Sequence, residues 1–272
     1  MTRDELKHLE DRYSLTLGLH AFALDDPSAR VDYRDRETFP AASTIKLYIL
    51  AKLLQSSATG RVSFDAELVV RRDDKVSGSG VLKALEDDRA YTVLDLATLM
   101  IIVSDNTATN LLIDLLGTDV INDYCCEQGW NDTHLAGKLQ VSTAPPTSSS
   151  YTTPRDLADV MYRLWTGALA PVFQTEVARR ILSAQHYTDQ LGREIGYDPY
   201  SSEVGEDDLR IASKSGSIRG VRNDVGIITR SEKGFVIAIM TKGAADLRFY
   251  PDNSGSRAIM DATSLAHKQF LR

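Results

Sequence analysis

The sequence predicts an α/β protein of the α+β type, with one sheet built from both termini and an all-helical domain inserted between them. Short β-rich runs, about five in all, lie near the two ends of the chain at residues 15–24, 31–34, 210–213, 225–229 and 235–241. The middle of the chain instead carries apolar residues at helical spacing. We therefore expect a sheet domain of residues 1–37 and 195–272 and a helical domain of residues 38–194.

The elements near the N-terminus follow from local patterns. Residues 2–13 place Leu6, Leu9 and Tyr13 at helical spacing on a charged background, which predicts an amphipathic helix. The turn residues 25–28 (Asp-Asp-Pro-Ser) then separate the first two predicted strands.

The helices of the middle and the end of the chain have recognisable signals. Residues 44–55 are apolar around most of the helix surface, which predicts a helix buried on several sides. Further helices are predicted at residues 92–102, 106–116, 154–164, 171–182 and 254–271. Gly117 ends the third of these six helices, and Pro lies near the start of the fourth and fifth.

The charge composition of the chain limits the kinds of partner that it can bind. The 272 residues include 31 Lys and Arg against 38 Asp and Glu, a net charge of −7, and basic residues never run longer than a pair. This balance excludes the basic footprint of a nucleic-acid-binding protein or of a protein that docks on an anionic membrane. We expect a monomer that acts on a small molecule, with no nucleic-acid or membrane partner.

Neither the cysteines nor the histidines indicate a disulfide bond or a metal site. Cys125 and Cys126 are adjacent, which makes an ordinary disulfide implausible, and we expect both to be small buried hydrophobes on a helix after Gly117. The five histidines show no metal-ligand spacing, so no metal or cofactor is expected. The first residues are acidic and lack a basic n-region, which predicts a cytoplasmic protein from the chain as written; a removed leader would make it secreted or periplasmic.

A hydroxyl and an amine stand three positions apart at the start of the buried helix, in Ser43-Thr44-Ile45-Lys46. Both project from one helix face, so the amine can take the proton of the serine, and the helix N-terminus favours the negative charge that develops on attack. Taken alone, the spacing is a weak signal, and a serine cap with a surface lysine is the simpler interpretation.

Two more short motifs strengthen the catalytic interpretation. Ser104-Asp105-Asn106 lies between two predicted helices, and Lys214-Ser215-Gly216 lies on a predicted strand. Alone, these are a helix cap and a turn. In this order and in these structural contexts, the three motifs together indicate a serine acyl-transfer site.

With these motifs the chain resembles the class A β-lactamases and their penicillin-recognising serine relatives. The likeness covers Phe39-Pro40-Ala41-Ala42 before Ser43, the Ser104 to Leu112 segment, Tyr151-Thr152-Thr153-Pro154 and the Lys214 motif. The resemblance implies an antiparallel sheet flanked by terminal helices, with the active site in the cleft between the sheet domain and the helical domain.

The resemblance also implies a role for each motif residue. Ser43 would be the nucleophile and Lys46 its general base, while Ser104 and Lys214 would relay a proton to the leaving nitrogen. The substrate-binding residues it implies are Asn106 for the side-chain amide, Ser215 for the carboxylate, Gly216 within the same motif, Ser217 whose N–H joins that of Ser43 in an oxyanion hole, and Arg222 for the carboxylate. A solvated arginine on a strand is the alternative for Arg222.

The chain departs from class A enzymes in one loop. These enzymes carry a glutamate there that activates the deacylating water, yet residues 133–155 contain neither Asp nor Glu. Gln140 is the nearest polar substitute, and an amide can position a water but cannot take its proton. The ion pair that usually braces the loop in the family is absent too, and residues 144–150 (Ala-Pro-Pro-Thr-Ser-Ser-Ser) replace the last half of the loop.

Three functions remain from the sequence. The first is a metal-free serine hydrolase that forms an acyl-enzyme on Ser43 with β-lactams or similar amides or esters. The second is a penicillin-binding or sensing protein that stays acylated, for which the missing glutamate is the reason. The third is a cytosolic serine amidase of a metabolite, favoured by the absence of a signal peptide.

Overall fold

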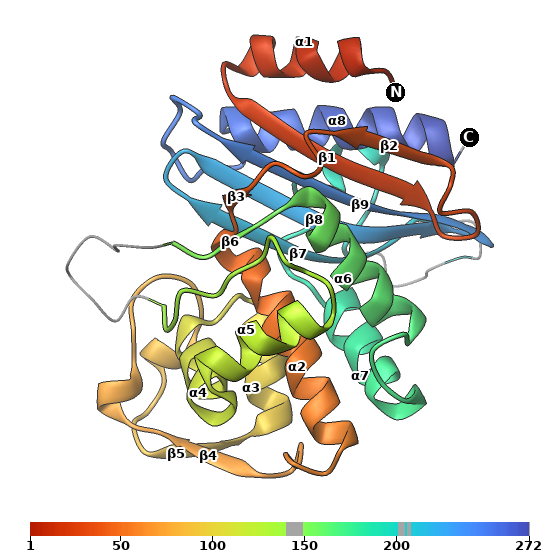
Figure 1. Cartoon of the computed structure of the whole chain (residues 1–272). Coiled ribbons are helices and arrows are strands. Elements are labelled where there is room, and N and C mark those ends of the chain that lie inside the picture. The colour runs from red at the N-terminus through yellow and green to blue at the C-terminus, as the bar shows by residue number, and fades with distance from the viewer. Residues whose placement is uncertain (140–148, 201–204, 206–207, 272) are drawn as a thin grey trace. The chain divides into compact units, whose positions relative to one another are not determined.

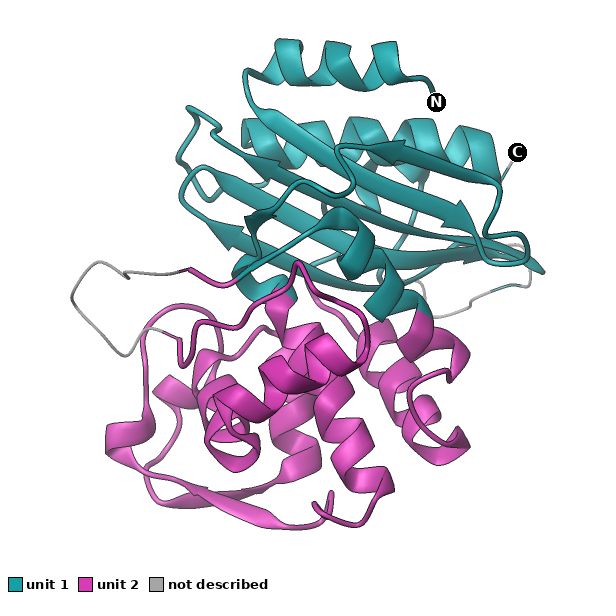
Figure 2. Cartoon of the chain, viewed as in Figure 1, with its two compact units in different colours: residues 1–44, 151–162, 187–272 teal, residues 45–150, 163–186 magenta. Residues whose placement is uncertain are grey.

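The computed structural model describes residues 1–139, 149–200, 205 and 208–271. The chain divides into two compact units, coloured separately in Figure 2. Unit 1 comprises Met1–Thr44, Tyr151–Tyr162 and Tyr187–Arg272, and unit 2 comprises Ile45–Ser150 and Arg163–His186.

Unit 1 is built on a five-stranded antiparallel sheet of order β2-β1-β9-β8-β7. Its strands are β1 (Thr16–Ala23), β2 (Arg30–Tyr33), β7 (Arg210–Ile218), β8 (Val221–Arg230) and β9 (Lys233–Lys242). The predicted sheet drawn from both termini is confirmed, since β1 pairs along its whole length with β9. A separate two-stranded pair joins β3 (Phe39–Pro40) to β6 (Tyr151–Thr152).

The two terminal helices pack on one face of this sheet (Figure 1). They are α1 (Arg3–Tyr13) and α8 (Ser254–Phe270). Thr2 and Glu5 form a capping box that starts α1, and Asn253 caps α8 through the N–H groups of Gly255 and Ser256. Leu6 and Leu9 of α1 join the strand and α8 residues in one apolar core, which fixes the sheet that carries the Lys214 motif.

Unit 2 contains most of the helices. They are α2 (Lys46–Ala58), α3 (Val93–Ile102), α4 (Asn106–Leu116), α5 (Thr118–Glu127) and α7 (Val172–Ser183), and α6 (Pro154–Thr166) runs from unit 1 into unit 2. The one antiparallel strand pair among its described residues joins β4 (Glu67–Val70) to β5 (Arg89–Thr92). Short 3₁₀ turns complete the chain: η1 (Ala42–Ile45), η2 (Arg72–Asp74), η3 (Leu82–Ala84) and η4 (Arg193–Ile195).

The α2 helix is buried almost throughout, as its sequence predicts. On α5 the prediction for the two cysteines is half wrong: Cys125 is buried, but Cys126 is exposed. The buried face of α5 consists of Ile121, Tyr124 and Cys125, and Cys126, about 100° further around the helix, lies outside that face.

The units differ in extent from the domains expected from the sequence. Residues 38–44 and 151–162 belong to unit 1 because β3 pairs with β6 and Asn223 of β8 binds the carbonyls of residues 40 and 41. Arg155 also pairs with Asp35, at 2.5 Å. No helix among the described residues combines the length and the apolarity needed to cross a membrane.

Candidate active site

Ser43 lies on the short η1 turn, one residue after Ala42, whose φ is +46°. The serine cap of the alternative interpretation is not formed at Ser43, because the α-helix begins only at Lys46 and its cap position, Ile45, makes no side-chain cap. Thr44 holds the turn instead, donating from its N–H and its hydroxyl to the carbonyl of Ala41 at 3.1 and 2.6 Å. The half-buried Ser43 hydroxyl is thus free of a structural capping role.

The backbone before Ser43 is fixed against strands β7 and β8 of the same unit. The Asn223 amide donates to the carbonyls of Pro40 and Ala41 at 2.8 and 3.1 Å. A Cβ at Gly216 would lie only 2.8 Å from the Ser43 backbone nitrogen, so only glycine fits there. Gly216 therefore lies directly beside the nucleophile candidate, and its neighbours Ser215 and Ser217 belong to the same strand.

Lys46 is completely buried in unit 2, and its ammonium group is surrounded by three acceptors. Nζ donates to the carbonyl oxygen of Ser104 at 2.7 Å, to Ser104 Oγ at 3.0 Å and to Asn106 Oδ1 at 2.9 Å. Lys46 is therefore not the surface lysine of the alternative interpretation, because it is buried against Ser104 and Asn106. Ser104 adopts a left-handed φ of +55°, which turns both its oxygens toward Nζ.

Asp105, between these two residues, forms the helix cap that the sequence offers for this motif and also organises the loop before α4. Its carboxylate caps α4 through the N–H of Ala108 and accepts from the N–H groups of Val81 and Leu82, at 2.6 and 2.9 Å. Gly80 is required beside it, since a Cβ would lie 2.3 Å from that carboxylate.

The segment from Ser77 to Gly80 supports the same loop by accepting hydrogen bonds from Asn106. The Asn106 side-chain amide donates to the Ser77 carbonyl at 3.1 Å, and the Asn106 backbone N–H donates to that of Ser79 at 3.1 Å. These contacts orient the Asn106 side chain, whose Oδ1 faces Lys46.

Lys214, on β7 of unit 1, is completely buried, and its Nζ donates to the Ser215 carbonyl at 2.8 Å. Burial lowers the pKa of Lys214 to about 7, and the negative charge of Asp224 opposes this fall. Asp224 is itself completely buried on β8, opposite Ser215 in the strand register. Burial raises the pKa of Asp224, and no hydrogen bond of normal geometry from a described residue reaches its carboxylate oxygens.

Comparison with known proteins places this arrangement in a family. The model of the β-lactamase enzyme family matches residues 1–270. The chain belongs to the β-lactamase enzyme family. The crystal structure of a β-lactamase from Sphaerobacter thermophilus has a TM-score of 0.85 and 31% identity, covering 98% of this chain and 97% of that one. The curated β-lactamase of Streptomyces fradiae is 28% identical over 268 residues, 94% of this chain and 81% of that protein.

Penicillin-binding relatives are similar to the chain as well. The structure of PBP-A has a TM-score of 0.80 and 29% identity, covering 97% of this chain and 95% of that one. A leucine-to-glutamate variant of PBP-A, solved as an acyl-enzyme complex with penicillin G, has a TM-score of 0.81 and 28% identity, with coverage of 97% and 95%.

In this member of the β-lactamase family Arg222 is not the solvated arginine of the alternative reading, because it is only 3% exposed. Its Nη1 donates to the carbonyls of Ile218 and Val221 at 2.8 and 2.7 Å, and its Nη2 donates to that of Arg248. Burial lowers the pKa of its guanidinium. Arg222 thus joins the β7–β8 turn to the loop after β9.

The first described part of the loop that lacks a glutamate ends at Leu139, and Gln140 lies outside the described residues. The Asn110 amide donates to the Leu139 carbonyl at 2.8 Å, and the Leu139 N–H donates to Asn110 Oδ1 at 2.7 Å. Asn110 is one helical turn along α4 from Asn106, so both asparagines lie on the same helix face. Leu139 is thereby held near the amide that binds Lys46, a contact between distant residues that no local motif signals.

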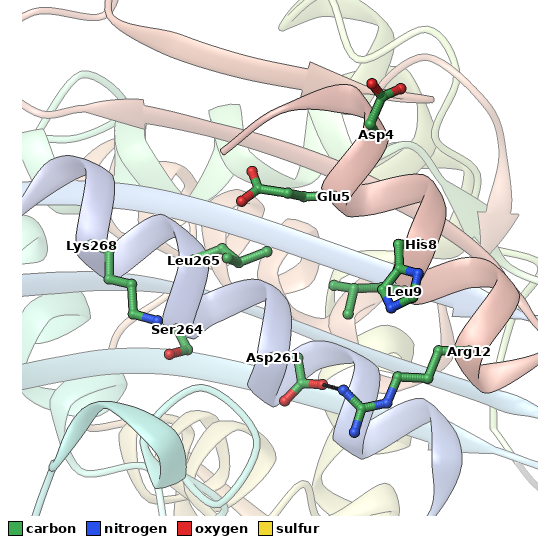
Figure 3. A pocket seen from close by; sticks show the side chains of 9 residues that line it. All are labelled: Asp4, Glu5, His8, Leu9, Arg12, Asp261, Ser264, Leu265 and Lys268. Atoms are coloured by element: carbon green, nitrogen blue, oxygen red, sulfur yellow. Dashed lines mark hydrogen bonds and ion pairs between the residues drawn. The ribbon is translucent and has the colours of Figure 1, made fainter.

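Two other features of unit 1 lie apart from these residues. A hollow of about 530 Å³ lies between α1 and α8 (Figure 3), lined by Asp4, Glu5, His8, Leu9, Arg12, Asp261, Ser264, Leu265 and Lys268. None of these belongs to the three motifs. His20, Asp32 and Asp35 bring possible metal-ligand atoms within 4.8 Å of one another, but Arg30 and Arg155 already pair with these carboxylates.

Proposed function

We propose that the chain is a serine enzyme that β-lactams acylate on Ser43 and that releases the acyl group slowly. The observation that carries the proposal is the Lys46 cluster. A fully buried amine held by Ser104 and Asn106 lies only three residues after a serine that has no capping role. A surface lysine beside a helix cap would show neither feature.

The proton steps follow from the donors and acceptors of the cluster. As an ammonium, Lys46 donates to all three acceptors; as a neutral amine, it donates twice and accepts from the Ser104 hydroxyl, which can rotate. Both protonation states are therefore satisfied in this pocket. In the proposed reaction neutral Lys46 takes the Ser43 proton as Oγ attacks the carbonyl. It returns that proton through Ser104 to the nitrogen when the carbon–nitrogen bond breaks, so the Ser43 O–H adds across the amide.

The residues of unit 1 provide most of the binding groups in this proposal. The N–H groups of Ser43 and Ser217 would stabilise the oxyanion, and the close approach of Gly216 to the Ser43 nitrogen supports this arrangement. Lys214 and Ser215 would bind the substrate carboxylate, while Asn106 of unit 2 would bind the side-chain amide. All these groups come from one chain, so we propose a monomer as the active form.

A second candidate, a penicillin-binding or sensing protein that stays acylated, is favoured by Leu139. The residue that Asn110 holds beside the Lys46 cluster has a side chain that cannot take a proton from water. The likeness to PBP-A is consistent with this candidate. The two candidates share the acylation step and differ only in how fast the acyl group is released.

Intact-protein mass spectrometry over time with a chromogenic cephalosporin tests both. The proposal expects one equivalent of adduct on Ser43 and a burst of product, followed by slow recovery of free protein over minutes or longer. Adduct that never disappears selects the penicillin-binding candidate. Multiple turnover at about 1–10³ s⁻¹ without a burst would show that another group serves as the deacylating base, and absence of any adduct would reject acylation altogether.

A further inference from the structure

Asn223 of β8 lies directly opposite Gly216 of β7 in the antiparallel register. Side chains of opposite residues leave a sheet on the same face, so the Asn223 amide extends on the side where Gly216 has no side chain. The backbone of Ser43 occupies the space beside Gly216, since a Cβ there would lie 2.8 Å from the Ser43 nitrogen. Asn223 is completely buried. A buried amide is therefore placed beside the turn that carries the proposed nucleophile.

Both ends of the Asn223 amide have a partner. Nδ2 donates to the carbonyl oxygens of Pro40 and Ala41 at 2.8 and 3.1 Å, and Oδ1 accepts from the Thr241 N–H of β9 at 3.3 Å. The bond from Thr241 fixes the orientation of the amide, because only its nitrogen end can donate to the two carbonyls. An apolar side chain of the same size could fill the space but would leave both carbonyls without this donor.

The two carbonyls belong to the segment that turns into Ser43. The Thr44 N–H donates to the Ala41 carbonyl at 3.1 Å and closes a turn in which Ala42 and Ser43 are the inner residues. Ala42 has a left-handed φ of +46°, which a residue other than glycine keeps only where its surroundings hold it. Because a turn closed between positions i and i+3 does not use the N–H groups of its inner residues, the direction of the Ser43 N–H follows from how the Ala41 carbonyl and Ala42 are held.

We propose that Asn223 is a positioning residue that holds the Ser43 N–H in the direction in which it binds the developing oxyanion. The proposal rests on the proposed acylation of Ser43 and gives a role in that step to a residue outside the three motifs. An oxyanion-hole donor acts only where it points at the position of the negative oxygen, about 2.7–3.1 Å away. A misplacement of about 1 Å can cost about 10²-fold in rate. Asn223 thus acts on acylation through the backbone of Ser43 and not through the substrate.

The test uses Asn223→Ala and a cephalosporin whose β-lactam carbonyl is labelled with carbon-13. We expect the rate constant of acylation to fall by about 10²-fold, while the dissociation constant of the complex that precedes acylation stays the same. The second readout is the infrared stretch of the ester carbonyl in the adduct, which slow release leaves time to record. This stretch should move to higher frequency, because weaker hydrogen bonds to the oxygen leave a stronger C=O bond. A merely structural role of Asn223 would not move it.

Asn223→Asp is the second variant, because it keeps the size of the side chain and loses the amide donor. A carboxylate would repel the carbonyls of Pro40 and Ala41, whereas the protonated acid can donate to one of them. Relative to the unmodified chain, the acylation rate of this variant should therefore recover in part as the pH falls, which lost packing would not produce. Acylation by Asn223→Asp at the rate of the unmodified chain at every pH would overturn the positioning role.

Asn253→Ala is the matched control. Asn253 is also buried in unit 1, and its amide also donates to two carbonyls, those of Asp246 and Arg248, at 2.7 and 2.8 Å. The control should lower thermal stability and leave the ester stretch unchanged. An unchanged stretch in Asn223→Ala, or an equal shift in Asn253→Ala, would overturn the positioning role while leaving acylation intact. If the unmodified chain forms no adduct, the acylation is rejected and the positioning role with it.

Discussion

Asn110 holds Leu139 by both atoms of its side-chain amide, at 2.8 Å to the carbonyl and 2.7 Å from the N–H. A side chain at position 139 therefore leaves the backbone at a fixed point beside the α4 face that carries Asn106. Lys138 adds an ion pair to Asp114 of α4 at 2.7 Å. We therefore choose position 139, whose backbone Asn110 fixes, as the place in the described part of this loop to introduce a deacylating base.

Leu139→Glu should convert slow release into turnover. A carboxylate at this position can take a proton from an attacking water, and general-base assistance is typically worth about 10²–10⁴-fold. The steady-state rate with a chromogenic cephalosporin should rise by one to several orders of magnitude while the burst is unchanged. Leu139→Gln has a side chain of similar size without a base and should leave both phases as they are; a rise with glutamine would contradict the role of the carboxylate.

Ser43→Ala should abolish the adduct without loss of stability. Ser43 caps no helix, so Ser43→Ala does not lose the roughly 1 kcal/mol that a serine cap contributes, and alanine fits the space of serine. Intact mass and thermal unfolding, measured on the same sample, check the two halves of this prediction. Hydrolysis that continues in the variant would contradict the assignment of the nucleophile.

Lys46→Ala should slow acylation by about 10²–10⁴-fold and also destabilise the protein. The change leaves the Ser104 carbonyl and Asn106 Oδ1 buried without their donor, at a cost of about 1–3 kcal/mol for each unsatisfied group. Lys52→Ala is the control for loss of a buried lysine on α2 outside the cluster. If both variants acylate equally fast, Lys46 is not the base.

Lys214→Ala should discriminate between anionic and neutral substrates. A charge-assisted bond to a carboxylate in a buried setting contributes more than one at the surface. The acylation rate should therefore fall more for a β-lactam than for its methyl ester. An equal fall for the two compounds would remove the carboxylate role and leave only a role in proton transfer.

The pH dependence should follow the pKa of Lys214, which burial lowers from 10.5 to about 7. Acylation by an anionic β-lactam at low concentration should weaken as the pH rises through about 7, because the ammonium loses its charge. Asp224→Asn removes the charge that opposes the fall in pKa, so the transition should move to lower pH. Glu232→Gln, at an exposed acid, should leave the transition in place, and a transition that does not move in Asp224→Asn would refute the coupling.

The pH dependence of thermal stability gives an independent check of the lowered pKa of Lys214. Between pH 7 and 10.5 the unfolded chain binds a proton at Lys214 that the folded chain does not bind, so this residue makes stability rise with pH over that window and level off below it. Lys214→Met should flatten this contribution to the slope of unfolding free energy against pH. A slope that is the same in the variant would contradict a lowered pKa.

Much of the fold follows from short-range patterns. The helix at residues 106–116 coincides with α4, with Asp105 as its cap and Gly117 at its end, because capping depends on residues within one turn. The start of α2 could not be placed in this way: positive φ at Ala42 and the bonds from Thr44 to Ala41 extend the turn before Lys46. The prediction that Cys126 is buried was wrong for a related reason, since the face of a helix that becomes buried depends on the elements that pack against it.

The three motifs, the lack of an acid between residues 133 and 155, and the pattern of strands at both ends around a helical middle are all visible in the amino-acid sequence. Which distant residues meet is visible only in the folded chain: Asn110 with Leu139, Asn223 with the backbone before Ser43, and Arg222 with Phe249. Periodicity and capping act over a few residues. Contacts across tens or hundreds of positions depend instead on how sheets and helices pack, and that packing is set by the whole core at once.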